Sequence, residues 1–221
     1  MEEFPLSLKY QDCVRAQYQL VMSLLKTRVL DLVIGFSMGG QCAYYWTLMH
    51  PEVVRDTVII CSSARTSRHN YQFLEGPKAA LEFSADYNQS SRKTTSLKPT
   101  GGLRAFGKAY SAWLTSPQWF EDELYKTIGY GTLSEWDKVA AGTNYDDWDP
   151  DDLLAMIDQY FRWEASKKES LMIPQAKFKV IPSAWGHLSG LGYDKKDESY
   201  IDEAISKFLS GCTSGWKRNG Q

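Results

Sequence analysis

The sequence predicts an α/β fold in which a mostly parallel sheet carries an inserted helical cap. Three observations lead to this prediction. A β-branched run at residues 29–34 leads through a Gly-x-Ser-x-Gly motif into a helical pattern at 38–49. A second buried strand pattern follows at 56–61, and a helix between two such strands makes them parallel neighbours. From about residue 70 to residue 163, strand patterns give way to helical ones.

Length and composition narrow the class of protein. The 221 residues suffice for one domain, or for one domain that carries an insertion. A net charge of −2 gives no reason to expect nucleic acid or a membrane surface as a partner. We find no apolar run of about 18 residues, and the acidic start does not resemble a signal peptide. The four cysteines are scattered, which predicts reduced thiols in a cytoplasmic protein and neither disulfides nor a metal site.

The first helix is expected at residues 12–26, with Asp12 as its N-cap and apolar residues at helical spacing. The strand at 29–34 follows and runs into residues 33–41, which read VIGFSMGGQ. This is the sequence form of a nucleophile elbow, a sharp strand-to-helix turn that exposes a serine.

The elbow gives each of its residues an expected role. Gly35 and Gly39 flank Ser37 because we expect a Cβ at either position to clash with neighbouring chain. Ser37 is then the candidate nucleophile, and the backbone N–H of Met38 at the helix start is a candidate oxyanion donor. The alternative is a glycine-rich strand end in which Ser37 only caps the following helix.

The segment at 62–67 leaves the second strand at its carboxyl end, where open α/β sheets hold their sites. Beyond it we expect helices at 72–83, 103–114, 117–128, 132–140 and 150–164. Their aromatic residues suit helix packing, and as a group they suit an apolar lid over the serine. An acidic cluster at 146–152 suggests a metal site, although a solvated loop and helix N-terminus is the favoured interpretation.

The sheet is expected to return at 177–182 and to lead into a loop that holds His187. A histidine downstream of a serine elbow, on a strand–loop–helix pattern, suits a general base. The alternative is an ordinary surface-loop histidine. An amphipathic helix at 197–209, stopped by Gly211, is expected to close the fold.

The predicted organisation has three parts. Residues 1–69 form the first part of the core with the elbow, 70–165 form the helical cap, and 166–221 complete the core with the His187 loop.

The motifs now placed resemble the homoserine O-acetyltransferase-like branch of the α/β-hydrolase superfamily. The matching stretches are DCVRAQ at 12–17, GFSMGGQ at 35–41, SARTS at 63–67, FLEG at 73–76, GLRAF at 102–106, DLLAM at 152–156 and IPSAWGH at 181–187. The resemblance implies a partial α/β-hydrolase fold with a helical cap, Ser37 as the nucleophile that accepts the acyl group, and His187 as general base.

Two departures from the family pattern bear on the chemistry. Family members have four strands before the elbow, and the loop after the third gives a second oxyanion N–H, whereas 34 residues precede Gly35 here. The family also places an aspartate on a strand upstream of the histidine, and residues 164–177 hold no such motif. Glu164 and Glu169 are the nearest upstream carboxylates. Glu169 is the better candidate for the acid, although a solvated surface glutamate is the favoured interpretation. We therefore expect weak catalysis and exposed sheet edges that promote association into oligomers.

Three functions stay open at this stage. The first is acyl transfer from acetyl-CoA or another acyl donor to a hydroxyl acceptor, with no permanently bound cofactor and no metal. The second is hydrolysis of small esters by the same serine. The third is a non-catalytic remnant that binds a small ligand or a partner.

Overall fold

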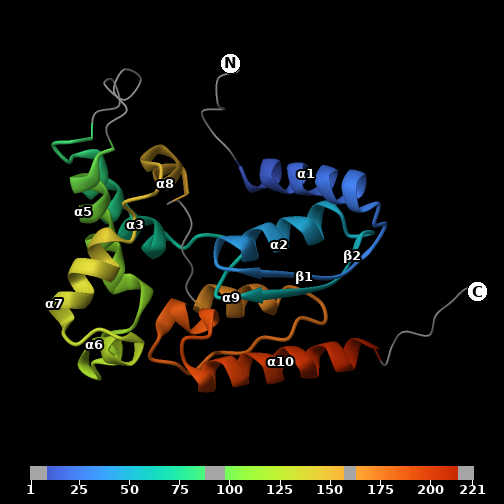
Figure 1. Ribbon diagram of the computed structural model, residues 1–221. Helices are drawn as coiled ribbons and strands as arrows, with labels where there is room; N and C mark the ends of the chain where they lie inside the picture. The colour runs from blue at the N-terminus through green and yellow to red at the C-terminus, as the bar shows by residue number, and fades with distance from the viewer. Residues whose placement is uncertain (1–8, 88–97, 157–162, 214–221) are drawn as a thin grey trace, which may run out of the picture. The chain divides into compact units, whose positions relative to one another are not determined.

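The computed structural model describes residues 9–87, 98–156 and 163–213 (Figure 1). Their contacts divide the chain into two compact units. The first unit, here called the sheet unit, comprises Met1–Arg65, Phe161–Pro182 and Ser189–Gln221. The second, here called the helical unit, comprises Thr66–Tyr160 and Ser183–Leu188. The loop at 183–188, which we expected in the core part, thus makes its contacts with the helical unit.

The sheet unit begins with α1 (Tyr10–Leu20), which continues as a π-helical turn, η1 (Val21–Leu25). Lys26 ends this turn in the left-handed conformation, at φ 51° and ψ 25°. The expected N-cap, Asp12, is wrong: Lys9 is the N-cap, and its N–H donates to the Asp12 carboxylate at 3.1 Å. A carboxylate is favourable in the first turn as well as at the cap, and the sequence pattern did not separate the two positions.

Two strands form the sheet of the described residues. β1 (Leu30–Phe36) and β2 (Val54–Ile60) are parallel, with Leu30 opposite Val54 and Phe36 opposite Ile60. Between them runs α2 (Met38–Met49), so the predicted strand–helix–strand unit is confirmed.

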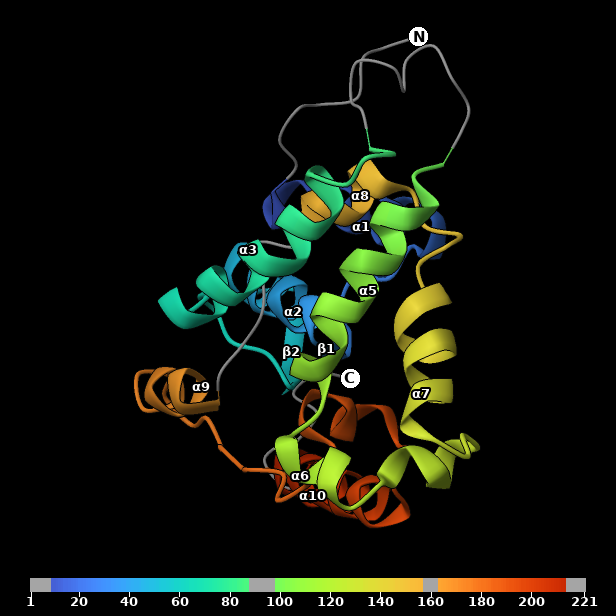
Figure 2. The same ribbon diagram turned by 90° about the vertical axis from the view of Figure 1, so that its left-hand side faces the viewer.

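Helices cover both faces of this sheet. α1 and α2 lie on one side, and α10 (Lys195–Thr213) lies on the other (Figures 1 and 2). Val14 of α1 and Trp46 of α2 are buried together with Val53 and Val54 at the start of β2. The Trp46 indole N–H donates to Gln17 Oε1 at 2.8 Å, which fixes α1 against α2.

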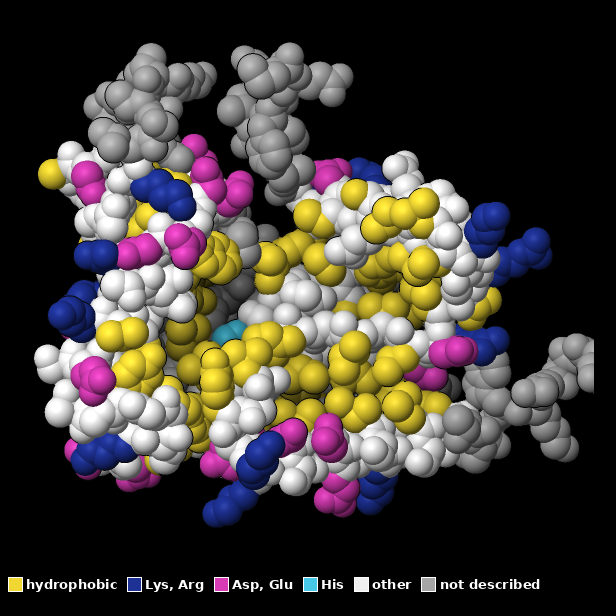
Figure 3. Space-filling view, viewed as in Figure 1, with side chains coloured by type: hydrophobic (Ala, Val, Ile, Leu, Met, Phe, Trp, Pro, Cys, Tyr) yellow, Lys and Arg dark blue, Asp and Glu magenta, His cyan; other side chains and the backbone are white. Residues whose placement is uncertain are grey.

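Part of the sheet unit stays open to solvent. Hydrophobic side chains gather between α2 and α10 on the face shown in Figure 3. The Ile34 side chain of β1 is 54% exposed. No strand of the described residues pairs with the outer edge of β1 or of β2.

Two expectations for the C-terminal part are wrong. Residues 177–182 form neither helix nor strand, and Gly211 lies inside α10 and does not stop it. Another helix of this unit, α9 (Trp163–Ser170), precedes the irregular segment.

The helical unit confirms the predicted insertion of helices. Its elements are α3 (Arg68–Glu82), α5 (Thr100–Leu114), α6 (Pro117–Glu121), η2 (Leu124–Ile128), α7 (Leu133–Trp136), η3 (Asp137–Thr143) and α8 (Pro150–Met156). α3 and α5 lie side by side (Figure 2) and bury Leu74, Leu81, Leu103 and Phe106 between them. In the part of the chain that the structure describes, no helix is both long and apolar enough to cross a membrane.

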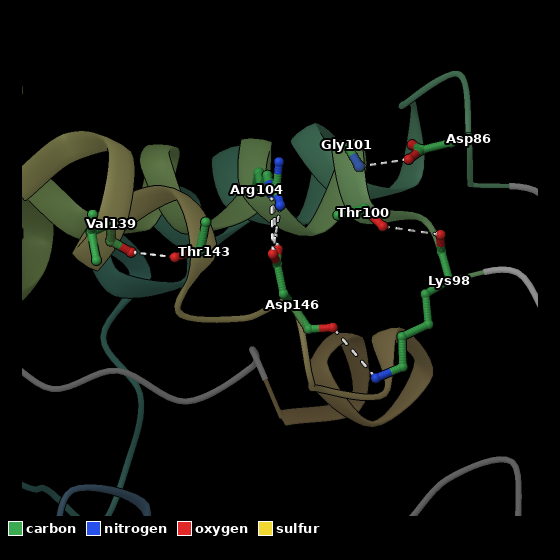
Figure 4. Close-up of polar contacts among 8 residues, drawn as sticks. All are labelled: Asp86, Lys98, Thr100, Gly101, Arg104, Val139, Thr143 and Asp146. Carbon is green, nitrogen blue, oxygen red and sulfur yellow. Dashed lines mark hydrogen bonds and ion pairs between the residues drawn. The ribbon is translucent and has the colours of Figure 1, made fainter. Parts of the chain in front are cut away.

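Carboxylates fix the start of α5 (Figure 4). The Asp86 carboxylate accepts hydrogen bonds from the backbone N–H groups of Gly101, at 2.6 Å, and Gly102, at 3.0 Å. Arg104 donates from Nε and Nη2 to the carboxylate of Asp146, at 3.1 and 2.7 Å. The hydrogen bond and the charge of this guanidinium lower the pKa of Asp146. α5 is thereby tied at its N-terminal turns to segments on both sides of it in sequence.

Candidate active site

Ser37 occupies the turn between β1 and α2, as the elbow motif predicts. Its φ of 53° and ψ of −122° lie in a region that residues with a side chain rarely adopt. The Ser37 N–H donates to the carbonyl of Ile60 at 2.9 Å, so the end of β2 holds the turn in place. The side chain makes no capping hydrogen bond to α2. The strain at Ser37 is thus not explained by a capping role for the serine.

The glycines around Ser37 have different roles. A Cβ added to Gly35 would lie 2.1 Å from the carbonyl oxygen of Gly39, so only glycine fits at position 35. The expected clash at Gly39 is wrong, because a Cβ there would meet nothing within 4 Å. A second close approach is at Gly40, where a Cβ would lie 2.4 Å from Cβ of Ser62. Gly40 lets the first turn of α2 pack on the segment after β2, a contact between distant segments that no local motif indicates.

Met38 is the first residue of α2. The first N–H groups of a helix have no partner within the helix, and they lie at the positive end of its dipole. The candidate oxyanion donor is therefore placed directly after the serine, at a position that suits an anion.

The segment after β2 is held tightly beside the elbow. Cys61 adopts a φ of 50°, and Ser63 is fully buried. The Gln41 side chain of α2 donates to the carbonyl of Ser63 at 3.3 Å, and the Ser63 hydroxyl donates to the carbonyl of Arg65 at 3.0 Å. These bonds fix the backbone at the carboxyl end of β2.

Glu169 of α9 binds this same segment. Its two carboxylate oxygens accept hydrogen bonds from the N–H groups of Ala64, at 2.8 Å, and Arg65, at 3.2 Å. Burial, and then the charge and a hydrogen bond of Glu169, raise the pKa of Tyr44 to about 12. The carboxylate is thus engaged with the protein, in contrast to the solvated glutamate that we favoured from sequence. The side chain of the other candidate, Glu164, lies outside the described residues.

His187 lies in a short 3-10 helix, η4 (Gly186–Leu191), and is partly buried. Desolvation lowers its pKa from 6.5 to about 4, so the imidazole is neutral at pH 7. A neutral imidazole can accept a proton, as a general base must. A carboxylate on the other ring nitrogen would act in the opposite direction and raise this pKa.

The predicted site residues are thus divided between the units. Ser37, Met38 and Glu169 belong to the sheet unit, and His187 belongs to the helical unit. Tyr44, the partner of Glu169, was not identified from the sequence, because an internal helix tyrosine carries no local signal of its partner.

Two carboxylates of the acidic cluster at 146–152, those of Asp149 and Asp151, accept hydrogen bonds within the helical unit. Asp149 Oδ1 accepts from the N–H groups of Asp151, at 2.8 Å, and Asp152, at 3.3 Å, where α8 begins. Asp151 accepts from the hydroxyl of Tyr87 at 3.1 Å. Among the described residues, no group of three or more His, Cys, Asp or Glu side chains is arranged to hold a metal ion.

Comparison with known proteins adds relatives of two kinds. The chain is 24% identical over 238 residues to the ethyl acetate hydrolase of Pseudomonas veronii, a match that covers 92% of this chain and 68% of that protein. It is 37% identical over 100 residues to the homoserine O-acetyltransferase of Zymomonas mobilis, a match that covers 45% of this chain and 26% of that protein. The chain thus spans about a quarter of the latter relative's length. No protein-family model matches the chain.

Solved structures support the same fold. The acetyl esterase MekB superposes with a TM-score of 0.78 at 22% sequence identity, over 92% of this chain and 69% of that one. The predicted α/β-hydrolase architecture is therefore confirmed in its partial form. The sequence relatives are hydrolases and acyltransferases by name, and the predicted kind of enzyme is confirmed as well. The chain is thus related to the homoserine O-acetyltransferase-like branch of the α/β-hydrolase superfamily, as its motifs predicted.

Proposed function

We propose that the chain is an acyl-transfer enzyme that works through an acyl-serine intermediate on Ser37. The observation that carries the proposal is the conformation of Ser37. A non-glycine residue is held at a positive φ between a parallel strand and a helix, with Gly35 making room for the turn. Strain of this kind persists where the surrounding structure enforces it, and it is typical of functional sites.

In the proposed reaction, Ser37 Oγ attacks the carbonyl carbon of an ester or thioester while its proton passes to the His187 imidazole. The Met38 N–H stabilises the oxyanion that forms on the carbonyl oxygen. When the leaving alkoxide or thiolate departs, it takes the proton from the imidazolium, and the acyl group stays on Ser37. A hydroxyl acceptor then gives its proton to His187 and attacks the acyl group, and the departing Ser37 Oγ takes that proton from the imidazolium as the acylated acceptor is released.

Acetyl-CoA or another small acyl donor fits this scheme as a co-substrate, with no permanently bound cofactor. The homoserine O-acyltransferases among the relatives support this choice. A cytoplasmic location is part of the proposal, and the four free cysteines support it. The proposal includes no nucleic acid and no membrane as partners, in keeping with the net charge of −2.

A second candidate is an esterase, in which water takes the place of the acceptor. The match to ethyl acetate hydrolase supports it, because that match covers 92% of this chain whereas the homoserine O-acetyltransferase match covers 45%. The transferase and the esterase share the acylation of Ser37. They differ only in the acceptor of the acyl group, which is a hydroxyl compound in the first case and water in the second. A third candidate, a non-catalytic remnant that binds a ligand, predicts no acylation at all.

A fluorophosphonate probe separates catalysis from the remnant, since it reacts with an activated serine. Trypsin cleavage after Arg28 and Arg55 releases residues 29–55, in which Ser37 is the one serine, so mass spectrometry locates the adduct without ambiguity. We expect labelling of this peptide, its loss in Ser37→Ala, and slower labelling in His187→Gln. Undiminished turnover of p-nitrophenyl acetate by Ser37→Ala would overturn the proposal. Adding homoserine or another alcohol to the acylated enzyme then separates transfer from hydrolysis by the product released.

A further inference from the structure

The loop that carries His187 is bound to the junction between α5 and α6 by one carbonyl oxygen. The Ala184 carbonyl accepts two hydrogen bonds from Ser116, one from the hydroxyl at 2.6 Å and one from the backbone N–H at 3.2 Å. Ser116 is also the N-cap of α6, because its hydroxyl accepts from the N–H of Trp119 at 3.3 Å. One side chain thus links the start of α6 to the His187 loop.

The backbone of the loop passes close to the same junction. Gly186, directly before His187, has a φ of 57°, and a Cβ there would lie 2.9 Å from the carbonyl carbon of Thr115. A side chain at position 186 would therefore be strained and would also collide with the backbone at Thr115. The absence of a Cβ lets the loop turn against the end of α5.

The residue before Gly186 anchors the loop in the core of the helical unit. Trp185 is 3% exposed, and its ring lies edge-to-face against Trp119 of α6, with centroids 5.7 Å apart. Leu188, on the other side of His187, packs on the same cluster, and its N–H donates to the Trp185 carbonyl at 3.0 Å. His187 is therefore held between two residues that are packed in the core of the helical unit.

We propose that Ser116 is a positioning residue for His187, acting through the Ala184 carbonyl to hold the loop against the α5–α6 junction. The proposal deepens the proposed function and rests on it for the role of His187 as general base. In this proposal, the Ser116 side chain of the helical unit controls the orientation and the hydration of the His187 imidazole. Loss of the hydroxyl bond leaves the Ala184 carbonyl with the weaker bond from the Ser116 N–H, at 3.2 Å, so we expect the imidazole to become more mobile and better hydrated.

The matched variants are Ser116→Thr and Ser116→Val, which have the same shape and differ in the hydroxyl. Ser116→Ala also removes the hydroxyl and leaves a smaller side chain than valine. Thr132→Ala is the control, because the Thr132 hydroxyl caps α7 by accepting from the N–H of Glu135 at 3.1 Å, an interaction that does not involve the Ala184 carbonyl. Two readouts are needed: the titration of the His187 ring by NMR, assigned among three histidines with His187→Gln, and the rate of Ser37 acylation.

We expect Ser116→Val and Ser116→Ala to raise the midpoint of the His187 titration by about one pH unit, since hydration favours the charged ring. We expect their acylation rates to fall about tenfold with little change in KM. Ser116→Thr and Thr132→Ala should keep the wild-type titration. An unchanged titration in the folded apolar variants overturns the proposal. The titration does not depend on turnover, so the positioning role is tested even if Ser37 proves unreactive and the proposed function fails.

Hydrogen exchange in the unaltered protein gives a test that needs no variant to fold. If the loop is bound to the junction, the amides of Trp185 and Leu188 and those of α5 should lose protection together under mild denaturant. Independent exchange of the loop, at a lower free energy of opening than α5, would contradict the proposal.

Discussion

At the scale of single residues, the elbow shows what a motif predicts well and what it misses. The spacing of Gly35 and Ser37 correctly predicted a turn that needs a missing Cβ, because the clash is with the carbonyl of Gly39 four residues along the same chain. Gly40 was missed because its close contact is with Ser62, from a segment that only the folded structure brings near. Local sterics can be derived from a motif, whereas packing between distant segments cannot.

Gly35→Ala and Gly39→Ala form a matched pair that tests this account of the elbow. A methyl group at position 35 must displace backbone, so we expect at least about 3 kcal/mol of destabilisation and loss of labelling at Ser37. A methyl group at position 39 meets open space in a helix, so we expect no loss and a gain of up to about 1 kcal/mol. For each variant, urea unfolding measures the free energy of unfolding, and the fluorophosphonate probe measures the labelling of Ser37. Equal effects of the two substitutions would contradict the geometry described for the turn.

At the scale of elements, the segment at 177–182 shows the limit of propensity. Its alternating apolar and basic residues predicted a strand, yet it is irregular. The Val180 carbonyl accepts from the hydroxyl of Tyr200 at 2.9 Å, and the Lys179 ammonium lies 5.7 Å from the centre of the Tyr200 ring. The segment is thus held along α10 by side chains. A strand also needs a neighbour for its backbone hydrogen bonds, and a sequence pattern does not supply one.

The loop that holds His187 makes stability depend on pH. The pKa of His187 in the folded state, about 4, lies below its ordinary value of 6.5, so the unfolded chain binds the proton more tightly. This group therefore destabilises the fold increasingly as the pH falls from 6.5 towards 4, by up to about 3 kcal/mol. Urea unfolding at several pH values, compared between wild type and His187→Gln, isolates the effect from the carboxylates. Parallel curves for the two proteins would show that the histidine is hydrated in the folded state.

At the scale of the whole molecule, the fold class and its helical insertion could be predicted because several spaced motifs point to the same architecture. Neither the extent of the sheet nor the attachment of the His187 loop to the helical unit followed from the sequence. The first depends on strand pairing, and the second depends on hydrogen bonds from the Ser116 hydroxyl and N–H to one backbone oxygen. Such contacts have no signature at the level of residue type.

In the part of the chain that the structure describes, no strand pairs with the outer edge of β1, and we propose that the protein associates there with a second copy of itself. An unpaired edge flanked by apolar side chains is a template for pairing, and Ile34 of β1 is exposed. Light scattering should give a mass above the 25.2 kDa of one chain. Ile34→Lys should weaken association about tenfold or more, because a charge on the edge opposes pairing. Leu48→Lys, at an exposed position of α2, is the control. A monomer at all concentrations would contradict the proposal.

The left-handed backbone at Lys26 has a consequence for protein engineering. Lys26 and Ser37 have nearly the same φ, 51° and 53°, and each carries a conformational cost that glycine would avoid. At Ser37 that cost accompanies the candidate nucleophile of an elbow, whereas Lys26 only ends a helical turn on the surface. The two positions are therefore opposite design targets despite their similar φ, and their ψ values, 25° and −122°, differ widely. Lys26→Gly should stabilise the folded protein by about 1 kcal/mol, a margin that can offset other, destabilising mutations. Ser37→Gly would relieve the same kind of strain but would remove the proposed nucleophile.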